Sequence, residues 1–191
     1  MFTKTKQKEI LNKLRKIKIE TNEIKIKHLN IDDLEWFIEE SHTEHFNKYL
    51  DYKYSTASSN AKAKAIIDER VYNKLRDIAL MNNNIKDEVR FIIFDANNNR
   101  IGDIGLKIIN ELSSIEISYY ISEKYINKGY CYKAIKVMLE AIKNSGYSGE
   151  IFAVIQSANK PSIKVVQNVG FKISDNFAGK YTNNFVFNII V

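Results

Sequence analysis

The segment around Gly129 carries the clearest chemical signal in the sequence. Residues 115–121 have the apolar character of a strand, a short polar turn follows, and Gly129 begins a segment with helical periodicity. The first N–H groups of a helix lack intrahelical partners and lie at the positive end of its dipole, so they favour an anion. A glycine there lets the anion approach the backbone closely. The pattern predicts a pyrophosphate-sized anion site, although an ordinary strand-to-helix connection shows the same pattern.

Three other residues have side chains capable of chemistry, and each has a plainer interpretation. His42 and His45 are close enough in sequence to form a metal pair, but no third ligand lies near them, so no metal site is expected. Cys131 falls in the first turn of the helix expected after Gly129, where a thiol pKa can be lowered. It has no histidine near it in sequence. As the only cysteine, it also excludes an intrachain disulfide and a thiolate zinc site.

The elements that position these residues follow from hydrophobic periodicity, and they predict an α/β fold. The segment 41–60 is polar and aromatic with little periodicity, which indicates a long loop or a broken helix. Helices are expected at 1–20, from about 30 to 38, at 61–81 with Tyr72 and Leu75 on its apolar stripe, at 129–143, and at 161–168. Strands are expected at 24–28, 88–94, 101–106, 115–121, 151–155, 171–173 and 185–191.

Length and composition indicate one globular domain at 21–191, preceded by a basic helical arm at 1–20. The chain has 191 residues, of which 45% are apolar and 27% charged, which are ordinary proportions for a soluble domain. No apolar run approaches the roughly 20 residues of a membrane-spanning helix. The basic N-terminus lacks the unbroken apolar stretch of a signal peptide, so a cytoplasmic location is expected.

The positive charge of the chain comes from the arm. Residues 1–18 hold seven basic residues and one acid, Glu9, which accounts for the net charge of +6. Ile10, Leu11, Leu14 and Ile17 recur on one helical face, so we expect this face to pack on the domain or on a partner subunit. The alternative is that the arm binds nucleic acid, ribosome or an anionic membrane.

Three motifs, in order and with matching spacing, resemble the GNAT superfamily of N-acetyltransferases over roughly residues 22–191. YINKGYCYKA resembles its pyrophosphate loop, EISYYI resembles its fourth strand, and NKPSIKVVQNVGF resembles its later Asn-x-x-Ser element. KIKHLNIDDLEWF is most similar to the branch of ribosomal-protein-alanine and polyamine acetyltransferases. The resemblance implies a mixed, mostly antiparallel sheet of about six to seven strands flanked by helices. It also implies transfer of an acetyl group from acetyl-CoA to a primary amine, such as a protein N-terminus or a polyamine, without a covalent enzyme intermediate.

The resemblance also implies which residues hold acetyl-CoA. The strand end pairs through its backbone with the pantetheine arm, the loop binds the pyrophosphate, and an asparagine contacts the pantetheine amides. By position in this sequence, these residues are Tyr119, Tyr120 and Ile121; Ile126, Asn127, Lys128, Gly129, Tyr130 and Cys131; and Asn159.

The same resemblance makes Glu116 the candidate base, acting through a water molecule on the attacking amine. Alternation along the strand places it with Ser118 and Tyr120 on one face. A solvated or salt-bridged strand residue is an equally weighted interpretation of Glu116. Ser162 is the candidate that assists the leaving thiolate, although a serine at a helix start is often a cap.

Departures from the family pattern leave two alternatives open. Ile126 stands where the loop usually has Arg or Gln, Cys131 stands at a small-residue position, and Val166 stands where many members have a catalytic tyrosine. The first alternative is a module that binds CoA but has lost turnover. The second is an interaction protein that uses the basic arm. The acceptor amine is set by loops without a shared motif, and the apolar C-terminal strands are compatible with a homodimer.

Overall fold

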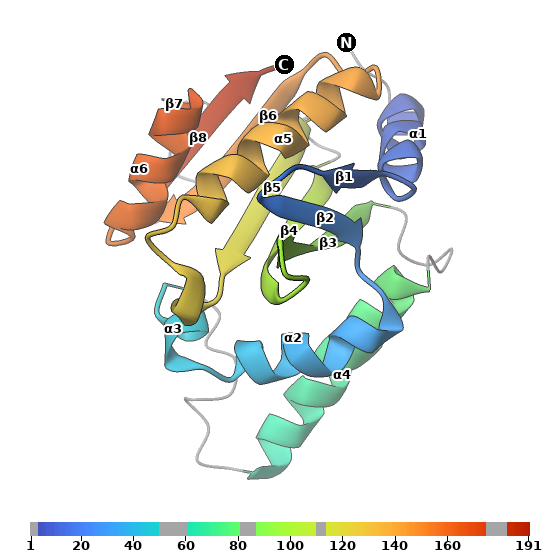
Figure 1. Cartoon of the computed structure of the whole chain (residues 1–191), viewed down its shortest axis with the longest axis vertical. Helices are drawn as coiled ribbons and strands as arrows, with labels where there is room; N and C mark the ends of the chain where they lie inside the picture. Colours follow the sequence, from blue (N-terminus) through green and yellow to red (C-terminus); the bar gives the residue numbers. More distant parts are fainter. Residues whose placement is uncertain (1–3, 50–60, 81–86, 110–113, 175–182) are drawn as a thin grey trace. The chain divides into compact units, whose positions relative to one another are not determined.

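The computed structural model describes residues 4–49, 61–80, 87–109, 114–174 and 183–191 (Figure 1). The chain forms two compact units, the first made of residues 1–28 and 87–191 and the second of residues 29–86. The first unit contains the sheet and the elements expected to hold the site. None of the described helices is long and apolar enough to cross a membrane.

The first unit has a mixed sheet, which within the described residues has eight strands in the order β1-β2-β3-β4-β5-β6-β8-β7. All neighbouring pairs are antiparallel except β5 and β6. The strands are β1 (Lys18–Glu20), β2 (Ile24–His28), β3 (Glu88–Asp95), β4 (Arg100–Ile109), β5 (Ser114–Ile121), β6 (Glu150–Gln156), β7 (Lys172–Ile173) and β8 (Asn184–Ile190). The predicted mixed, mostly antiparallel sheet is therefore confirmed, with one strand more than expected.

The additional strand is β1, in a segment that the sequence assigned to the N-terminal helix. Helix α1 (Lys4–Leu14) ends before it, and Lys18–Glu20 pair with Lys25–Lys27 of β2. The helical period of the arm stops at Leu14, and Ile17 and Ile19 then alternate with charged residues. A three-residue strand carries too little pattern to be separated from the end of a helix by sequence alone.

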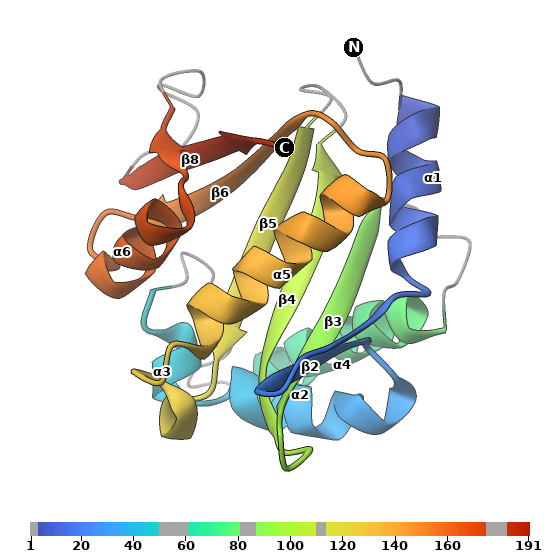
Figure 2. The ribbon, with the colours of Figure 1, turned by 45° about the horizontal axis from the view of Figure 1, so that its top comes forward.

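Two helices of the first unit pack against each other. Helix α5 (Tyr130–Asn144) crosses the sheet and contacts β5, β2 and α6 (Lys160–Val169) (Figure 2). Its amphipathic pattern explains this packing, since Ala134, Ile135 and Met138 are buried in the same cluster as the strand residues. Both helices agree with the predicted ranges, and Pro161 lies in the first turn of α6, where its missing N–H is tolerated.

The apolar face of the N-terminal arm is buried in the core of the first unit. Ile10, Leu11 and Leu14 are at most 2% exposed and belong to the same cluster as the sheet. Polar contacts hold the helix in place: Lys13 Nζ donates to the carbonyl of Ser145 at 3.3 Å, and Arg15 Nη2 donates to that of Glu88 at 2.9 Å. The arm therefore packs as its periodicity predicts. Binding of a polyanion by its exposed lysines stays a prediction.

The second unit is helical within its described residues. It contains the 3-10 helix η1 (Ile31–Asp33), α2 (Leu34–Ser41), α3 (Glu44–Asn47) and α4 (Ala61–Ala79). Phe37 stacks edge-on against Phe46, and Leu75 and Ile78 of α4 are buried. Tyr72 is 41% exposed, so its predicted place in the buried stripe is wrong. The stripe of α4 is centred between Leu75 and Ile78, which leaves Tyr72 at its edge. Of the loop or broken helix expected at 41–60, the described part contains the end of α2 and the short helix α3, and residues 50–60 lie outside the described residues.

Truncating Leu11 to Ala tests the packing of the arm. We expect the free energy of unfolding to fall by about 2–5 kcal/mol, because the side chain is fully buried and its removal leaves a cavity. Denaturant unfolding of the full chain measures the change. Lys16→Ala, on the exposed side of the same segment, is the matched control and should stay within about 0.5 kcal/mol of the parent. Equal stabilities for the two variants would contradict the packing.

Candidate functional site

The backbone between β5 and α5 forms a concave turn lined by N–H groups. Ile126 ends the 3-10 helix η2 (Glu123–Tyr125), and Asn127 and Gly129 both have left-handed backbone angles, with φ of 62° and 76°. The first bond of the helix runs from the Lys133 N–H to the Gly129 carbonyl at 3.1 Å, so the N–H groups of residues 130–132 precede the helical ladder. This is the geometry of an anion cradle at a helix N-terminus.

The side chains of the turn leave the cradle open. A Cβ at Gly129 would meet nothing closer than Lys133 Cε at 3.9 Å, so space is available, and the positive φ is what favours glycine there. Ile126 is 40% exposed. Lys128 is exposed, and its Nζ lies 5.2 Å from the centre of the Tyr125 ring. A lysine ammonium is thus held beside a turn that lacks the usual Arg or Gln.

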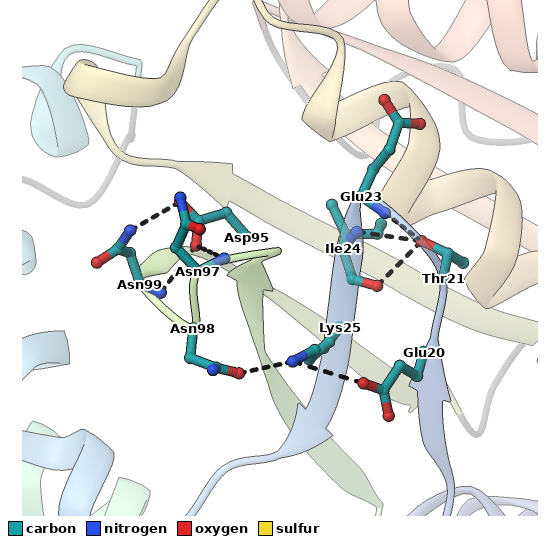
Figure 3. Close-up of polar contacts among 9 residues, drawn as sticks. All are labelled: Glu20, Thr21, Glu23, Ile24, Lys25, Asp95, Asn97, Asn98 and Asn99. Atoms are coloured by element: carbon teal, nitrogen blue, oxygen red, sulfur yellow. Dashed lines mark hydrogen bonds and ion pairs between the residues drawn. The ribbon is translucent and has the colours of Figure 1, made fainter.

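Two hairpin turns are held by polar contacts near the start of α5 (Figure 3). In the β1–β2 turn, the Thr21 hydroxyl accepts from the Ile24 N–H at 3.1 Å, and Glu23 pairs with Lys133 of α5. In the β3–β4 turn, Asp95 accepts hydrogen bonds from Asn97 and Asn99.

Lys25 joins the two turns, because its Nζ lies 2.8 Å from Asn98 Oδ1 and 3.5 Å from Glu20 Oε1. Burial would raise the pKa of Asp95, but its hydrogen bonds and the charge of Lys128 outweigh burial and lower it. The Glu23–Lys133 pair thus connects the first hairpin to the helix, and Lys25 connects the two hairpins to each other.

Strand β5 pairs with β6 only near its first residues and then separates from it. The parallel register consists of Ile115 with Ile151 and Glu116 with Phe152, whereas β5 continues to Ile121. On its other side, β5 pairs with β4 along its whole length, and β6 pairs with β8 from Glu150 to Gln156. The strands therefore diverge after Glu116 (Figure 2). The backbone of residues 119–121 lines this opening, between the point of divergence and the anion cradle.

Glu116 lies where the opening begins, on the polar face of the sheet. Its register partner on β4 is Lys107, which pairs in turn with Glu88 of β3. Burial raises the pKa of Glu116, Lys107 partly offsets this, and Glu88 raises it further. A carboxyl group with a raised pKa is better suited to proton transfer near neutral pH than an ordinary glutamate.

The neighbouring row of the polar face is occupied by an internal ion pair. Arg90 Nη1 contacts Asp103, and Arg90 Nη2 lies 3.6 Å from Glu88 Oε1. Gly105 makes room for this guanidinium, because a Cβ there would lie 3.1 Å from Arg90 Nη2. The charge of Arg90 is thus balanced by Asp103 and Glu88, and Glu116 does not contribute to that pairing.

Three residues of β5 and α6 meet at the other face of the opening. Tyr119 Oη lies 2.7 Å from Ser162 Oγ, and the Ser162 N–H donates to Asn159 Oδ1 at 3.2 Å. Asn159 is the N-cap of α6, so the side-chain oxygen predicted to contact a cofactor also caps this helix. Val166 is fully buried in the core. Sequence reasoning used only the backbone of Tyr119, because no local pattern indicates a side-chain contact with a residue 43 positions away.

The pKa of Cys131 is not lowered, although a position at a helix N-terminus can have that effect. Its thiol packs against the core, and burial raises its pKa to about 12. Desolvation favours the neutral thiol over the thiolate. Cys131 is therefore a packing residue of the first helical turn. In the described part of the chain, no group of three or more His, Cys, Asp or Glu side chains could hold a metal ion. His42 and His45 therefore belong to no such group.

Comparison with known proteins agrees with this architecture. The sequence model of the acetyltransferase (GNAT) domain family matches residues 23–172. No curated protein matches the sequence significantly.

Solved structures share the fold at low sequence identity. RimL, a ribosomal L7/L12 α-N-protein acetyltransferase in complex with coenzyme A, has a TM-score of 0.71 at 13% identity, covering 92% of this chain and 98% of its own. Spermidine N-acetyltransferase from Vibrio cholerae, in complex with CoA and spermine, has a TM-score of 0.67 at 19% identity. The match covers 89% of this chain and 96% of that enzyme. PaiA N-acetyltransferase from Thermoplasma acidophilum, in complex with coenzyme A, has a TM-score of 0.65 at 23% identity. The match covers 88% of this chain and 99% of that protein. At these low identities, the TM-scores show a common fold.

The raised pKa of Cys131 predicts slow alkylation of the native protein. With a pKa of about 12, the thiolate fraction at pH 7 is roughly a thousandfold below that of an ordinary thiol. We expect iodoacetamide to modify the native chain correspondingly slowly, as followed by mass spectrometry. The same chain unfolded in guanidinium chloride is the control and should react at the rate of a free cysteine. Equal rates in the two states would contradict the raised pKa.

Proposed function

This chain belongs to the acetyltransferase (GNAT) family, and from that membership we propose that it transfers an acetyl group from acetyl-CoA directly to a primary amine. The observation that carries the proposal is the alignment of the anion cradle at Gly129 with the opening between β5 and β6. The cradle lies at the outer end of this opening and Glu116 at its inner end. An extended ligand with a pyrophosphate at one end and a thioester at the other fits this arrangement.

In this proposal, backbone groups bind most of the cofactor. The turn at 126–131 holds the pyrophosphate, mainly through the N–H groups at the start of α5, and Lys128 adds positive charge beside them. The Ile126 N–H already donates to the Glu123 carbonyl. The pantetheine arm follows the edge of Tyr119–Ile121 past the point where β6 diverges, towards the N-terminus of α6 at Asn159. Because the cradle is made of backbone groups, Ile126 and Cys131 are compatible with binding.

Glu116 is proposed as the base that removes the proton from the attacking amine, through a water molecule. Three observations support this role: its place where the strands diverge, its separation from the Arg90–Asp103 ion pair, and the pKa raised by burial. CoA-bound relatives of this fold acetylate protein N-termini and polyamines, so the acceptor proposed here is an amine of that general class.

Acetyl-CoA should stabilise the fold, and a charge at position 129 should abolish this effect. A ligand specific for the native state at 100 times its Kd adds about 2.7 kcal/mol, or roughly 5–10 °C in Tm for a chain of this size. We expect Gly129→Asp to lose the shift, because its carboxylate would repel the pyrophosphate. Thermal unfolding with and without acetyl-CoA measures the effect.

Gly129→Asn is the matched control, since Asn and Asp have the same size and both tolerate a left-handed backbone. It should retain a substantial part of the shift. If acetyl-CoA at millimolar concentration leaves the Tm of the parent chain unchanged, acetyl-CoA binding is excluded. Equal Tm shifts for the Asp and Asn variants would show that the pyrophosphate does not bind at this turn.

Replacing Glu116 by Gln tests the base. Turnover at pH 7 should fall by about 10²–10⁴-fold, as is typical when a general base is lost, while the Kd for acetyl-CoA stays near that of the parent. The loss should shrink towards pH 10, since lysine-like amines have a pKa of about 10.4 and need no base once they are deprotonated. Thiol release with a panel of amines measures turnover, and Glu140→Gln, on the exposed side of α5, is the control.

The pH profile of the parent chain gives a second check on Glu116. A base must be deprotonated to act, so kcat/KM should fall as the pH drops through its pKa, and this limb should lie above the range of an ordinary glutamate. Lys107→Met removes the charge that lowers the pKa and should move the limb to higher pH. An unmoved limb, or full activity of Glu116→Gln at pH 7, would assign the base to another residue.

A further inference from the structure

Tyr119 of β5 and Ser162 of α6 form a hydroxyl pair beside the opening between β5 and β6. The two side-chain oxygens are 2.7 Å apart, and Tyr119 Oη also lies 3.4 Å from the Ser162 carbonyl oxygen. The residues belong to elements that are connected through β6, and β5 is no longer paired with β6 at this level. The contact is therefore a tertiary one, in the space proposed for the thioester end of the cofactor.

The pair includes Ser162, one helical turn before the position at which many members of the family have a tyrosine. Val166, one helical turn after Ser162, is fully buried and has no hydroxyl. In this chain the phenol comes from the strand instead of the helix, and it meets the helix at Ser162. The two groups together supply a hydroxyl donor near the sulfur without a polar side chain at 166.

The hydrogen positions follow from the acidity of the two hydroxyls. A phenol, with a pKa of about 10, is a stronger acid than an aliphatic alcohol, so Tyr119 is the better donor and Ser162 Oγ the better acceptor. Burial, with a contribution from Cys131, raises the pKa of Tyr119, so the phenol keeps its proton at neutral pH. When Tyr119 donates to Ser162 Oγ, the serine hydrogen points to a different acceptor.

We propose that Tyr119 is a positioning residue for acetyl transfer, which donates to Ser162 Oγ and thereby directs the Ser162 hydroxyl hydrogen at the sulfur of the departing CoA. This inference rests on the proposed function. It gives a role to a side chain at the end of β5, where only backbone pairing with pantetheine was proposed above.

The reaction step balances without a proton leaving either hydroxyl. The amine forms the C–N bond, Glu116 takes the amine proton through water, the C–S bond breaks, and its electron pair goes to sulfur. The thiolate accepts a hydrogen bond from Ser162 and is protonated by solvent after release, since an ordinary thiol has a pKa of about 8.5. Glu116 and Tyr119 project from opposite faces of β5, so the proposed proton removal and thiolate departure are served by different faces of the strand.

Tyr119→Phe is the direct test, because it removes only the hydroxyl. We expect kcat to fall about 10- to 100-fold, which is less than the 10²–10³ of an oxyanion-hole donor because a thiolate is a good leaving group. The Kd for acetyl-CoA should change less than about threefold, because the proposed cofactor contacts are backbone groups. Tyr147→Phe is the matched control: it also removes a phenol hydrogen bond inside the first unit, to the Glu150 carbonyl at 2.8 Å, and should keep the parent kcat.

Ser162 variants test whether Tyr119 acts through Ser162, and the split between kcat and the Kd for acetyl-CoA separates that role from a merely structural one. If Tyr119 acts through Ser162, Tyr119→Phe should cost nothing further in the Ser162→Ala background, whereas independent effects would multiply. Ser162→Thr keeps the hydroxyl and should retain most of the kcat. Parent kcat in Tyr119→Phe, or multiplied losses in the double variant, would overturn the inference and leave the proposed function intact. No thiol release by the parent chain with any amine would overturn both.

Discussion

Strands β5 and β6 pair only at Ile115 and Glu116 and then diverge, which opens the sheet at the proposed site. A strand that leaves its neighbour gives up ladder hydrogen bonds, so the separation persists only if both strands are held elsewhere. Here β4 pairs with β5 over its whole length and β8 pairs with β6 over its whole length. The two halves of the sheet are thus individually complete, and the opening between them is a stable feature of the fold.

The elements around this opening are held by contacts that come from distant parts of the chain. The N-terminal arm packs into the core and donates to carbonyls at the end of α5 and the start of β3. The β1–β2 turn is joined to α5 through Glu23 and Lys133. A helix whose N-terminus must present N–H groups to an anion benefits from such support, because a frayed first turn would lose the cradle.

Strand β5 divides the proposed chemistry between its two faces. Glu116 lies on the polar face, in a row with Lys107 and Glu88 that sets its protonation. Tyr119 lies on the other face and meets α6. Because side chains alternate along a strand, the residues proposed for proton removal and for departure of the thiolate lie on opposite faces of β5. The same strand edge is proposed to hold the cofactor, so binding and both steps depend on one element.

Local patterns in the sequence predicted the glycine at the start of α5, the alternation that places Glu116 on a polar face, the buried stripe of the arm and the order of the strands from β2 to β8. Each is set by residues within one or two turns of each other, where periodicity and backbone preference act. Only the tertiary structure decided that Lys18–Glu20 join the sheet, that Cys131 has a raised pKa and that Tyr119 meets Ser162. Strand pairing, desolvation and side-chain contacts across 43 residues depend on how distant elements pack, which no local pattern encodes.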